Sequence, residues 1–419
     1  MTITTDVRSE VRTWLDANWD PERPLSEWRE ILMDSGWGCP TWPEQWHGRG
    51  LDREMGSIVG DEFNWVGAVG PAIGVGMGLA APTILDHGSD DLKTRFLRRA
   101  ATGEHKWCQL FSEPGSGSDL AGLSAHAERV GDEWIVNGQK VWNTGARTAD
   151  YGLLMARTDQ DAPKHRGITY FVLPMKQEGV EVRPIVQMNG YQSFNEVFIS
   201  DARIPASYIV GDINDGWRVG LTTLAYERVG IGTIFSAPSS ANAKGRTATE
   251  AAEEASAYLH TYVWYPSRMG RVDLLIPHAQ AAGRSADPRI RQRIAYVQTL
   301  ARLDQLTKDR ARAARAAGRA PGPEGSIAKL VLSHIARASA ATHSAIAGPS
   351  GLLPGEDGAL GGTAAEITLS FPAQSIAGGT DEIQLNILAE RVLGLPKEPQ
   401  LDTDVPFREV RRSSGRASQ

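Results

Sequence analysis

The residue pattern changes character twice along the chain, and the order of these changes restricts the fold more than any other feature. Residues 1–105 carry apolar residues at helical spacing, residues 106–215 consist of short apolar runs separated by turn residues, and helical spacing returns over 216–395. No long helix interrupts the middle runs, so they predict an antiparallel sheet. The sequence therefore predicts an α+β protein with an N-terminal helical domain, a middle antiparallel β-domain and a C-terminal helical bundle. Residues 396–419 are polar and are expected to be a mobile tail.

Individual runs predict the elements of each region. Strands are expected at 133–136, 153–156, 168–173, 180–182 and 196–199. The dipeptide Asn137-Gly138 follows the first of these and is typical of a two-residue hairpin turn. Helices are expected from Ile290 to Gly318, from about Ile327, and from Glu382 to Leu393. Residues 231–270 give no clear helix assignment.

The composition excludes several classes of function. The chain has 419 residues and a formal net charge of −6, from 44 basic and 50 acidic side chains, which argues against a nucleic-acid-binding surface. Cys39 and Cys108 cannot form a disulfide framework or a Cys-rich metal site, so we expect small buried hydrophobes in a reducing compartment. No HExxH pair, GxGxxG or GxxxxGK occurs, which disfavours a zinc enzyme, a Rossmann nicotinamide site and a P-loop.

One uncharged stretch, Phe63–Leu85, is long enough at 23 residues to span a bilayer. Its prolines and numerous glycines leave little apolar surface to bury in lipid, so we expect a closely packed interior helix pair of a soluble protein. Residues 1–20 have no apolar segment behind a basic one, which predicts no secretory signal. A cytoplasmic protein without a membrane span is expected.

Four short segments carry residues suited to chemistry, and two of them lie near the start of the β-domain. In Trp107–Asp119, the glycines and the hydroxyls of Ser112 and Ser118 suit a phosphate or the polar edge of a ring, although such a loop also occurs as a plain turn. Trp142 and Thr144 are two residues apart, so in a strand their side chains would point to the same face. They could flank a planar cofactor or form an ordinary half-buried face.

The other two segments lie in the C-terminal region. Ala377–Asp381 places a glycine turn before a helix N-terminus, which suits an anion or serves only as a cap. Glu227 and Arg228 lie in an otherwise uncharged helical stretch, Leu221–Val229. The carboxylate there faces either a pocket or solvent with a local ion pair.

Taken together and in this order, the four segments resemble the acyl-CoA dehydrogenase family over about residues 10–398. Phe111–Asp119 resembles the family's first signature, and Ile376–Gln384 with Ile387–Arg391 resembles its C-terminal signature. Two long motifs far apart in the chain are more specific than any single loop. The resemblance implies the family's fold, with a barrel-like middle domain, and a FAD-dependent flavoprotein of lipid metabolism.

The resemblance also assigns site residues by position. Those implied to bind FAD are Gln109, Phe111, Ser112, Gly117, Ser118, Trp142, Thr144, Arg291, Gln292, Thr380 and Glu382. Thr144 would lie near flavin N5, and Gly117 with Ser118 near the pyrophosphate. Arg291 and Gln292 would reach the FAD of a neighbouring subunit, which implies a homotetramer or a heterotetramer with a related chain. Arg228 and Ser118 would contact the acyl-CoA.

The catalytic base is where this sequence departs from many family members. These members carry a glutamate immediately before the Gly-Thr of the C-terminal signature, where this chain has Gly378. Another branch, resembling isovaleryl- and long-chain-acyl-CoA dehydrogenases, places the glutamate directly before the CoA-contacting arginine. Glu227-Arg228 matches that arrangement. The resemblance therefore implies Glu227 as the general base.

The implied reaction is α,β-dehydrogenation of an acyl-CoA thioester to the trans-2-enoyl-CoA. Glu227 would remove the α-proton, the backbone N–H of Gly378 would stabilise the thioester oxygen, and the β-hydride would pass to flavin N5. The electron acceptor would be an electron-transfer flavoprotein. Two alternatives remain: a flavin oxidase or monooxygenase on this fold, and a non-catalytic subunit of a heteromeric dehydrogenase.

The acyl group is not identified by the sequence. Gly378-Gly379 removes side-chain volume beside the thioester, which hints at a branched or ring-bearing chain, although glycine there also serves the turn.

Overall fold

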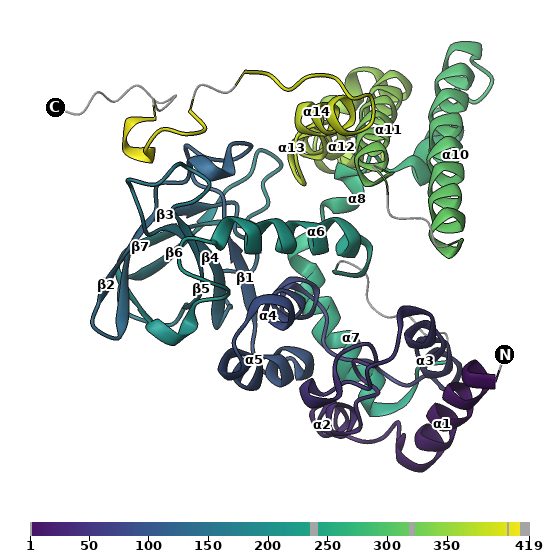
Figure 1. Cartoon of the computed structure of the whole chain (residues 1–419). Coiled ribbons are helices and arrows are strands. Elements are labelled where there is room, and N and C mark those ends of the chain that lie inside the picture. The colour runs from purple at the N-terminus through teal and green to yellow at the C-terminus, as the bar shows by residue number, and fades with distance from the viewer. Residues whose placement is uncertain (1, 235–241, 318–321, 323, 400–401, 411–419) are drawn as a thin grey trace. The chain divides into compact units, whose positions relative to one another are not determined.

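The computed structural model describes residues 2–234, 242–317, 322, 324–399 and 402–410. The chain divides into two compact units, and helices and strands are labelled in Figure 1. The first unit comprises residues 1–185, 192–261 and 401–419, and the second comprises residues 186–191 and 262–400. The predicted order of helices, sheet and helices is confirmed.

The N-terminal helices form the first part of unit one. They are α1 (Thr2–Asn18), α2 (Leu25–Ser35), α3 (Arg53–Val66), α4 (Ala81–His87) and α5 (Asp90–Thr102). Asp52 and Ser89 cap α3 and α5, because each side chain accepts a hydrogen bond from the backbone N–H three residues on. Trp28 is buried among these helices, and its indole N–H donates to the carbonyl of Val69 at 2.6 Å.

The uncharged stretch Phe63–Leu85 covers the end of α3, a π-helical turn (Gly76–Ala80) and most of α4. It is partly helical, as expected, but α3 packs on α1 and α4 on α5, so the two helices do not form the predicted pair. A β-carbon on Gly76 would lie 3.0 Å from the Trp107 ring, which shows how closely the backbone approaches that side chain. Among the described helices, none combines the length and the apolar character that crossing a membrane requires.

The middle of the chain forms one seven-stranded sheet. Its strands are β1 (Trp107–Leu110), β2 (His126–Val130), β3 (Glu133–Val141), β4 (Tyr151–Arg157), β5 (Ile168–Pro174), β6 (Val180–Ile185) and β7 (Phe194–Pro205). The order is β1-β4-β2-β3-β7-β6, with β5 also paired to β4. The expected antiparallel pairing holds for β2–β3, β3–β7, β6–β7 and β4–β5, whereas β1 and β2 both run parallel to β4. The long connection from β1 to β4 permits that direction.

The hairpin turn predicted at Asn137-Gly138 is wrong. The strand β3 runs through both residues, and the turn lies at Gly131, between β2 and β3. Gly138 instead lies at a bulge where the register of β3 against β7 shifts. A β-carbon there would collide with the β-carbon of Ala125, so glycine is required by a close backbone approach rather than by a turn.

The two helices that follow the sheet belong to the first unit, although the sequence grouped them with the C-terminal bundle. They are α6 (Gly216–Ile234) and α7 (Gly245–Leu259). An ion pair joins α7 to α2, with Arg29 Nη1 2.7 Å from Glu254 Oε2. Glu250 also accepts a hydrogen bond from the backbone N–H of Leu25 at 2.7 Å, at the start of α2. These contacts are between segments too distant in sequence for a local pattern to predict.

The second unit is a set of helices around a small apolar core. The helices are α8 (Tyr265–Arg268), α9 (Leu275–Ala281), α10 (Pro288–Ala316), α11 (Glu324–Ala347), α12 (Thr363–Ser370), α13 (Pro372–Ile376) and α14 (Asp381–Arg391). Ile290 and Val297 of α10 pack with Ile335 and Ile346 of α11, as the helical spacing predicts.

Part of the C-terminal tail contradicts the expectation of mobility. Residues 402–410 pack on the first unit and include a short 3-10 helix, Phe407–Glu409. Phe407 is only 3% exposed, so this one aromatic residue anchors an otherwise polar segment. Residues 411–419 lie outside the described part of the chain.

Candidate active site

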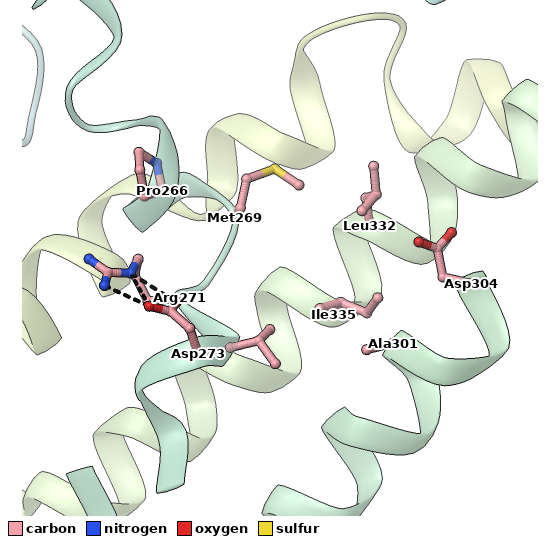
Figure 2. A pocket seen from close by; sticks show the side chains of 9 residues that line it. Pro266, Met269, Arg271, Asp273, Ala301, Asp304, Leu332 and Ile335 are labelled. Carbon is pink, nitrogen blue, oxygen red and sulfur yellow. Dashed lines mark hydrogen bonds and ion pairs between the residues drawn. The ribbon is translucent and has the colours of Figure 1, made fainter. Parts of the chain in front are cut away.

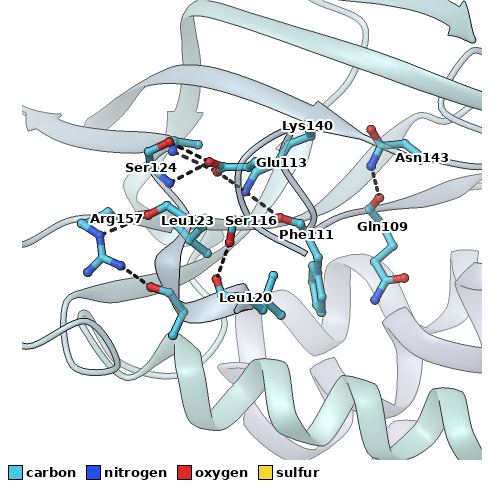
Figure 3. A network of polar contacts seen from close by, with 12 residues as sticks. Gln109, Phe111, Glu113, Ser116, Leu120, Leu123, Ser124, Lys140, Asn143 and Arg157 are labelled. Atoms are coloured by element: carbon cyan, nitrogen blue, oxygen red, sulfur yellow. Dashed lines mark hydrogen bonds and ion pairs between the residues drawn. The ribbon is translucent and has the colours of Figure 1, made fainter. Parts of the chain in front are cut away.

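The loop Phe111–Asp119, which the sequence predicts to hold the flavin and which we call the flavin loop, is held to the sheet by a buried ion pair. Lys140 Nζ on β3 lies 2.8 Å from Glu113 Oε1 and also donates to the carbonyl of Phe111 at 3.0 Å (Figure 3). The two charged side chains are 0% and 5% exposed. Glu113 also accepts hydrogen bonds from the N–H and hydroxyl of Ser124 and from the N–H of Ala125, at 2.7–2.9 Å. The loop is thereby tied to β3.

Electrostatics keeps this carboxylate charged. Burial alone would raise the pKa of Glu113, but Lys140 and the backbone N–H groups of Ser124 and Ala125 outweigh burial and lower it. The pair therefore persists as a charge-assisted link. Sequence reasoning missed both residues, although Glu113 lies inside the first signature.

The exposed end of the loop suits an anion. Ser116 is buried, and its hydroxyl donates to the carbonyl of Asp119, which holds the turn. Gly117 and Ser118 are exposed, and a β-carbon on Gly117 would meet nothing within 4 Å. Within the described chain, no hydrogen bond is recorded from the backbone N–H groups of these two residues to a protein acceptor. Open, unshielded N–H groups on a fixed loop fit a pyrophosphate.

The sequence predicts Trp142 and Thr144 on one face of a strand. The structure contradicts this, because both residues lie just beyond the end of β3. Trp142 has a φ of +64°, so the strand alternation ends at Val141. Its indole is 58% exposed and packs edge-on against Phe194, with ring centroids 5.7 Å apart. A large aromatic surface held outward beside the loop fits a planar ring system.

Asn143 connects this turn to β1. Its side-chain N–H donates to the carbonyl of Gln109 at 2.7 Å, and its own carbonyl accepts from Asn195 at 2.6 Å. The two segments predicted to flank the flavin are therefore joined directly. Both Asn143 and Asn195 are buried, and neither role was predicted.

Glu227 lies on α6 and contacts the same strand. The Gln109 side-chain N–H donates to Glu227 Oε2 at 3.5 Å, a long hydrogen bond. Glu227 is half-buried. The structure thus brings the predicted base beside β1, which leads into Phe111 and Ser112. The side chain of Arg228 lies outside the described part of the chain.

The remaining predicted residues lie in the second unit. Gly378 and Gly379 have φ values of +69° and +81°, a conformation that favours glycine, and the carbonyl of Gly378 accepts from Gln384 Nε2 at 3.0 Å. Thr380 caps α14 by accepting from the N–H of Ile383. This turn before a helix N-terminus has the predicted form.

Asp381 anchors the same turn. It is buried and lies 2.7 Å from Lys329 Nζ, which also donates to the carbonyl of Ser375 at 3.1 Å. Burial would raise the pKa of Asp381, but the hydrogen bonds that its carboxylate accepts, first that from Lys329, outweigh burial and lower the pKa. Glu382 is exposed beside it, and Arg291 and Gln292 are exposed near the start of α10.

A separate pocket in the second unit contains none of the predicted site residues. It lies between α10, α11 and the segment 266–273, and Figure 2 shows Arg271 bonded to Asp273 on one side. Its lining residues are Pro266, Met269, Arg271, Val272, Asp273, Ala301, Asp304, Leu332 and Ile335.

Family models match three stretches of the chain. They are the acyl-CoA dehydrogenase N-terminal domain over residues 3–104, the middle domain over residues 108–202 and the C-terminal domain over residues 274–393. The middle stretch contains the loop Phe111–Asp119 and the exposed indole of Trp142. The C-terminal stretch contains the Gly378-Gly379 turn.

Curated relatives agree with these models. The chain is 36% identical over 374 residues to acyl-CoA dehydrogenase FadE34 of Mycobacterium tuberculosis, covering 89% of this chain and 47% of that protein. It thus spans about half the length of FadE34. It is 34% identical to acyl-CoA dehydrogenase IpdE1 of the same organism, covering 88% of each.

Solved structures show the same fold. The ChsE4-ChsE5 complex from Mycobacterium tuberculosis matches with a TM-score of 0.64 and 26% identity, covering 95% of this chain and 98% of that chain. A variant of the Tcur3481-Tcur3483 steroid ACAD matches with a TM-score of 0.64 and 25% identity, covering 94% of this chain and 99% of that chain. With all three domain models matched, the chain belongs to the acyl-CoA dehydrogenase family of FAD-dependent oxidoreductases.

Proposed function

We propose that the protein converts an acyl-CoA thioester to the trans-2-enoyl-CoA, with Glu227 as general base. One observation carries this proposal: the Glu227 carboxylate lies 3.5 Å from Gln109 Nε2, on the strand that enters the flavin loop. Position 378, where other family members carry the base, is glycine. Glu227 therefore supplies the carboxylate that the reaction needs.

The side chains divide the work of the reaction. FAD, when bound, accepts the hydride from the substrate β-carbon. Glu227 removes the α-proton, and the Gln109 amide orients its carboxylate by donating a hydrogen bond. The N–H of Gly378 stabilises the negative charge that develops on the thioester oxygen. Gln384 supports that turn by holding the Gly378 carbonyl.

We assign the remaining predicted roles in the same way. Loop residues Gly117 and Ser118 would bind the FAD pyrophosphate, with Ser118 also near the substrate, and Trp142 and Thr144 would lie against the flavin. Arg228 would bind the CoA portion. Thr380 and Glu382 would contact the ADP part of FAD. Each of these proposed roles applies to the enzyme with FAD and acyl-CoA bound.

The proposed substrate is a ring-bearing or branched acyl-CoA. A β-carbon on Gly378 would meet nothing within 4 Å, so the space beside this turn is open in the second unit. A solved relative with 25% identity is named a steroid ACAD, which is a bulky substrate class. Equal rates with short straight-chain acyl-CoAs would contradict this assignment.

We further propose that the protein acts as a tetramer, with itself or with a second related chain, and passes electrons to an electron-transfer flavoprotein. Two of the similar solved structures, ChsE4-ChsE5 and Tcur3481-Tcur3483, carry names with two components, which supports assembly with a second chain.

The decisive experiment is anaerobic reduction of the bound flavin by a panel of acyl-CoAs. Glu227→Gln should retain FAD and lose at least about a hundredfold in reduction rate, because the general base is removed. The matched control is Glu133→Gln, which alters an exposed pair with Arg203 and should reduce at the wild-type rate. A Glu227→Gln rate close to wild type would overturn the assignment of the base.

The same experiment tests the alternatives. Wild-type protein that holds FAD but is reduced by no acyl-CoA would identify a non-catalytic subunit. Reduced flavin that air reoxidises at the rate of turnover would identify an oxidase.

A further inference from the structure

The C-terminal segment 402–410 docks on the β-domain by specific contacts. Backbone N–H groups of Phe407 and Arg408 donate to the carbonyls of Ala162 and Gln160 at 3.0 and 3.1 Å. Pro406 forms a bridge with Pro163, and Arg408 pairs with Asp161 at 2.8 Å. The segment therefore has a fixed register on the 160–163 loop.

Phe407 is the apolar anchor of this segment. Its ring is buried, and the Arg157 guanidinium lies 3.4 Å from the ring centroid. Arg157 ends strand β4 and is itself 1% exposed. A guanidinium removed from water over an aromatic face is a strong cation–π contact.

Arg157 also contacts the backbone that directly follows the flavin loop. Its guanidinium donates to the carbonyl of Ala121 at 2.7 Å and to that of Leu123 at 3.3 Å (Figure 3). These carbonyls immediately follow the loop that carries Gly117 and Ser118. One buried cation thus joins the Phe407 ring to the base of the loop.

Lys164 makes a second connection. Its ammonium lies 2.7 Å from Asp402 and 3.3 Å from both carboxylate oxygens of Asp119, the last residue of the loop. Burial opposes charge on Lys164, but its hydrogen bonds with Asp402 and Asp119 outweigh burial and raise its pKa. Two cations therefore connect the C-terminal segment to this region, Lys164 at the last residue of the flavin loop and Arg157 just beyond it.

We propose that residues 402–410 form a C-terminal strap that positions the flavin loop, with Phe407 acting through Arg157 and Asp402 acting through Lys164. The inference rests on the proposed role of this loop in holding the FAD pyrophosphate. Backbone N–H groups bind an anion well only when they are held in place beforehand. The strap supplies this order without touching the cofactor, so its residues are positioning residues.

The first test measures FAD affinity. Apoprotein variants are titrated with FAD, and flavin fluorescence gives the dissociation constant. Phe407→Ala should weaken FAD binding about tenfold, because the cation–π contact is lost, while kcat at saturating FAD stays near wild type. Phe407→Tyr keeps the ring and should restore the affinity. Glu409→Gln, at an exposed residue of the same segment, is the matched control and should bind FAD normally.

The second test restores the strap in trans. A chain ending at Glu398 loses both connections and should bind FAD at least as weakly as Phe407→Ala, and a synthetic peptide of residues 402–410 should recover the affinity. The same peptide with Phe407→Ala should not. If the shortened chain does not fold, as judged by circular dichroism, Phe407→Ala and Asp402→Asn decide the question.

The outcomes are distinguishable from those of the proposed function. Unchanged FAD affinity in both Phe407→Ala and Asp402→Asn would overturn the strap while leaving the dehydrogenase assignment intact. Wild-type protein that binds no FAD would instead overturn the proposed function.

Discussion

At the scale of single residues, Lys140 is predicted to contribute strongly to stability. Its ammonium is fully buried and is neutralised by Glu113 at 2.8 Å. Lys140→Met leaves that carboxylate buried without its counter-charge, so we expect a loss of about 3–5 kcal/mol in the free energy of unfolding. Urea unfolding followed by circular dichroism measures this loss.

The control for Lys140 is an exposed lysine in the same sheet region. Lys176 pairs with Asp150 at 2.5 Å but is 72% exposed. Lys176→Met should therefore cost less than about 1 kcal/mol, since water screens such pairs. Equal costs for the two variants would show that the Glu113–Lys140 pair adds nothing beyond an ordinary surface contact.

Among the elements, β3 depends on the bulge at Gly138. An alanine there would drive its β-carbon into that of Ala125, and the backbone of one strand must move. We expect Gly138→Ala to destabilise the protein by about 1–3 kcal/mol, a typical cost of overpacking. Gly60→Ala, in the middle of α3 with nothing within 4 Å, should instead stabilise by about 0.5–1 kcal/mol. Thermal unfolding of the two variants should shift in opposite directions.

The same strand shows what the sequence can predict. Regular periods identified α10 from Ile290 and its neighbours, and β4 and β5 from their apolar runs, because burial selects those positions directly. The turn predicted from Asn137-Gly138 is wrong, because the pairing of β3 with β7 outweighs the turn preference of this dipeptide. The first signature predicts that Phe111–Asp119 is the flavin loop. The Glu113–Lys140 pair and the Phe407–Arg157 contact had no local signal, since each joins residues that meet only after folding.

At the scale of the whole molecule, the second unit carries a built-in acid sensitivity. His278 and His343 are buried with their Nδ1 atoms 3.0 Å apart. His343 Nε2 lies 3.1 Å from the carbonyl of Arg271, so Nε2 carries the proton, and Nδ1 of the neutral ring accepts from His278. Burial, followed by the charge of His343, lowers the pKa of His278 to about 4. Burial also lowers the pKa of His343.

The sign of the effect follows from these shifts. Both rings bind protons more weakly in the folded chain than in the unfolded chain, where the pKa is about 6.5. The contribution of the two neutral rings to the free energy of unfolding is fully present above that unfolded-state pKa. It is lost as the pH falls toward 4, by at most about 3 kcal/mol for His278. Hydrogen exchange of peptides from α9 and α11 should rise over this range. His334→Gln, at an exposed histidine of α11, should leave the profile unchanged.

The exposed apolar face of α10 gives the test of assembly. Tyr296, Leu303 and Leu306 are 48–57% exposed on this helix, and Arg291 and Gln292 are exposed near its start. An exposed apolar stripe on a long helix is typical of a surface that a second chain covers. If Arg291 and Gln292 reach a neighbour's FAD, loss of assembly must also release FAD. Leu303→Glu should therefore lower both the mass measured by light scattering and the FAD content, whereas Arg302→Gln, at the adjacent exposed residue, should change neither. A Leu303→Glu monomer that holds FAD as tightly as wild type would show that each chain binds its cofactor alone, because the second subunit would then contribute no contact to it.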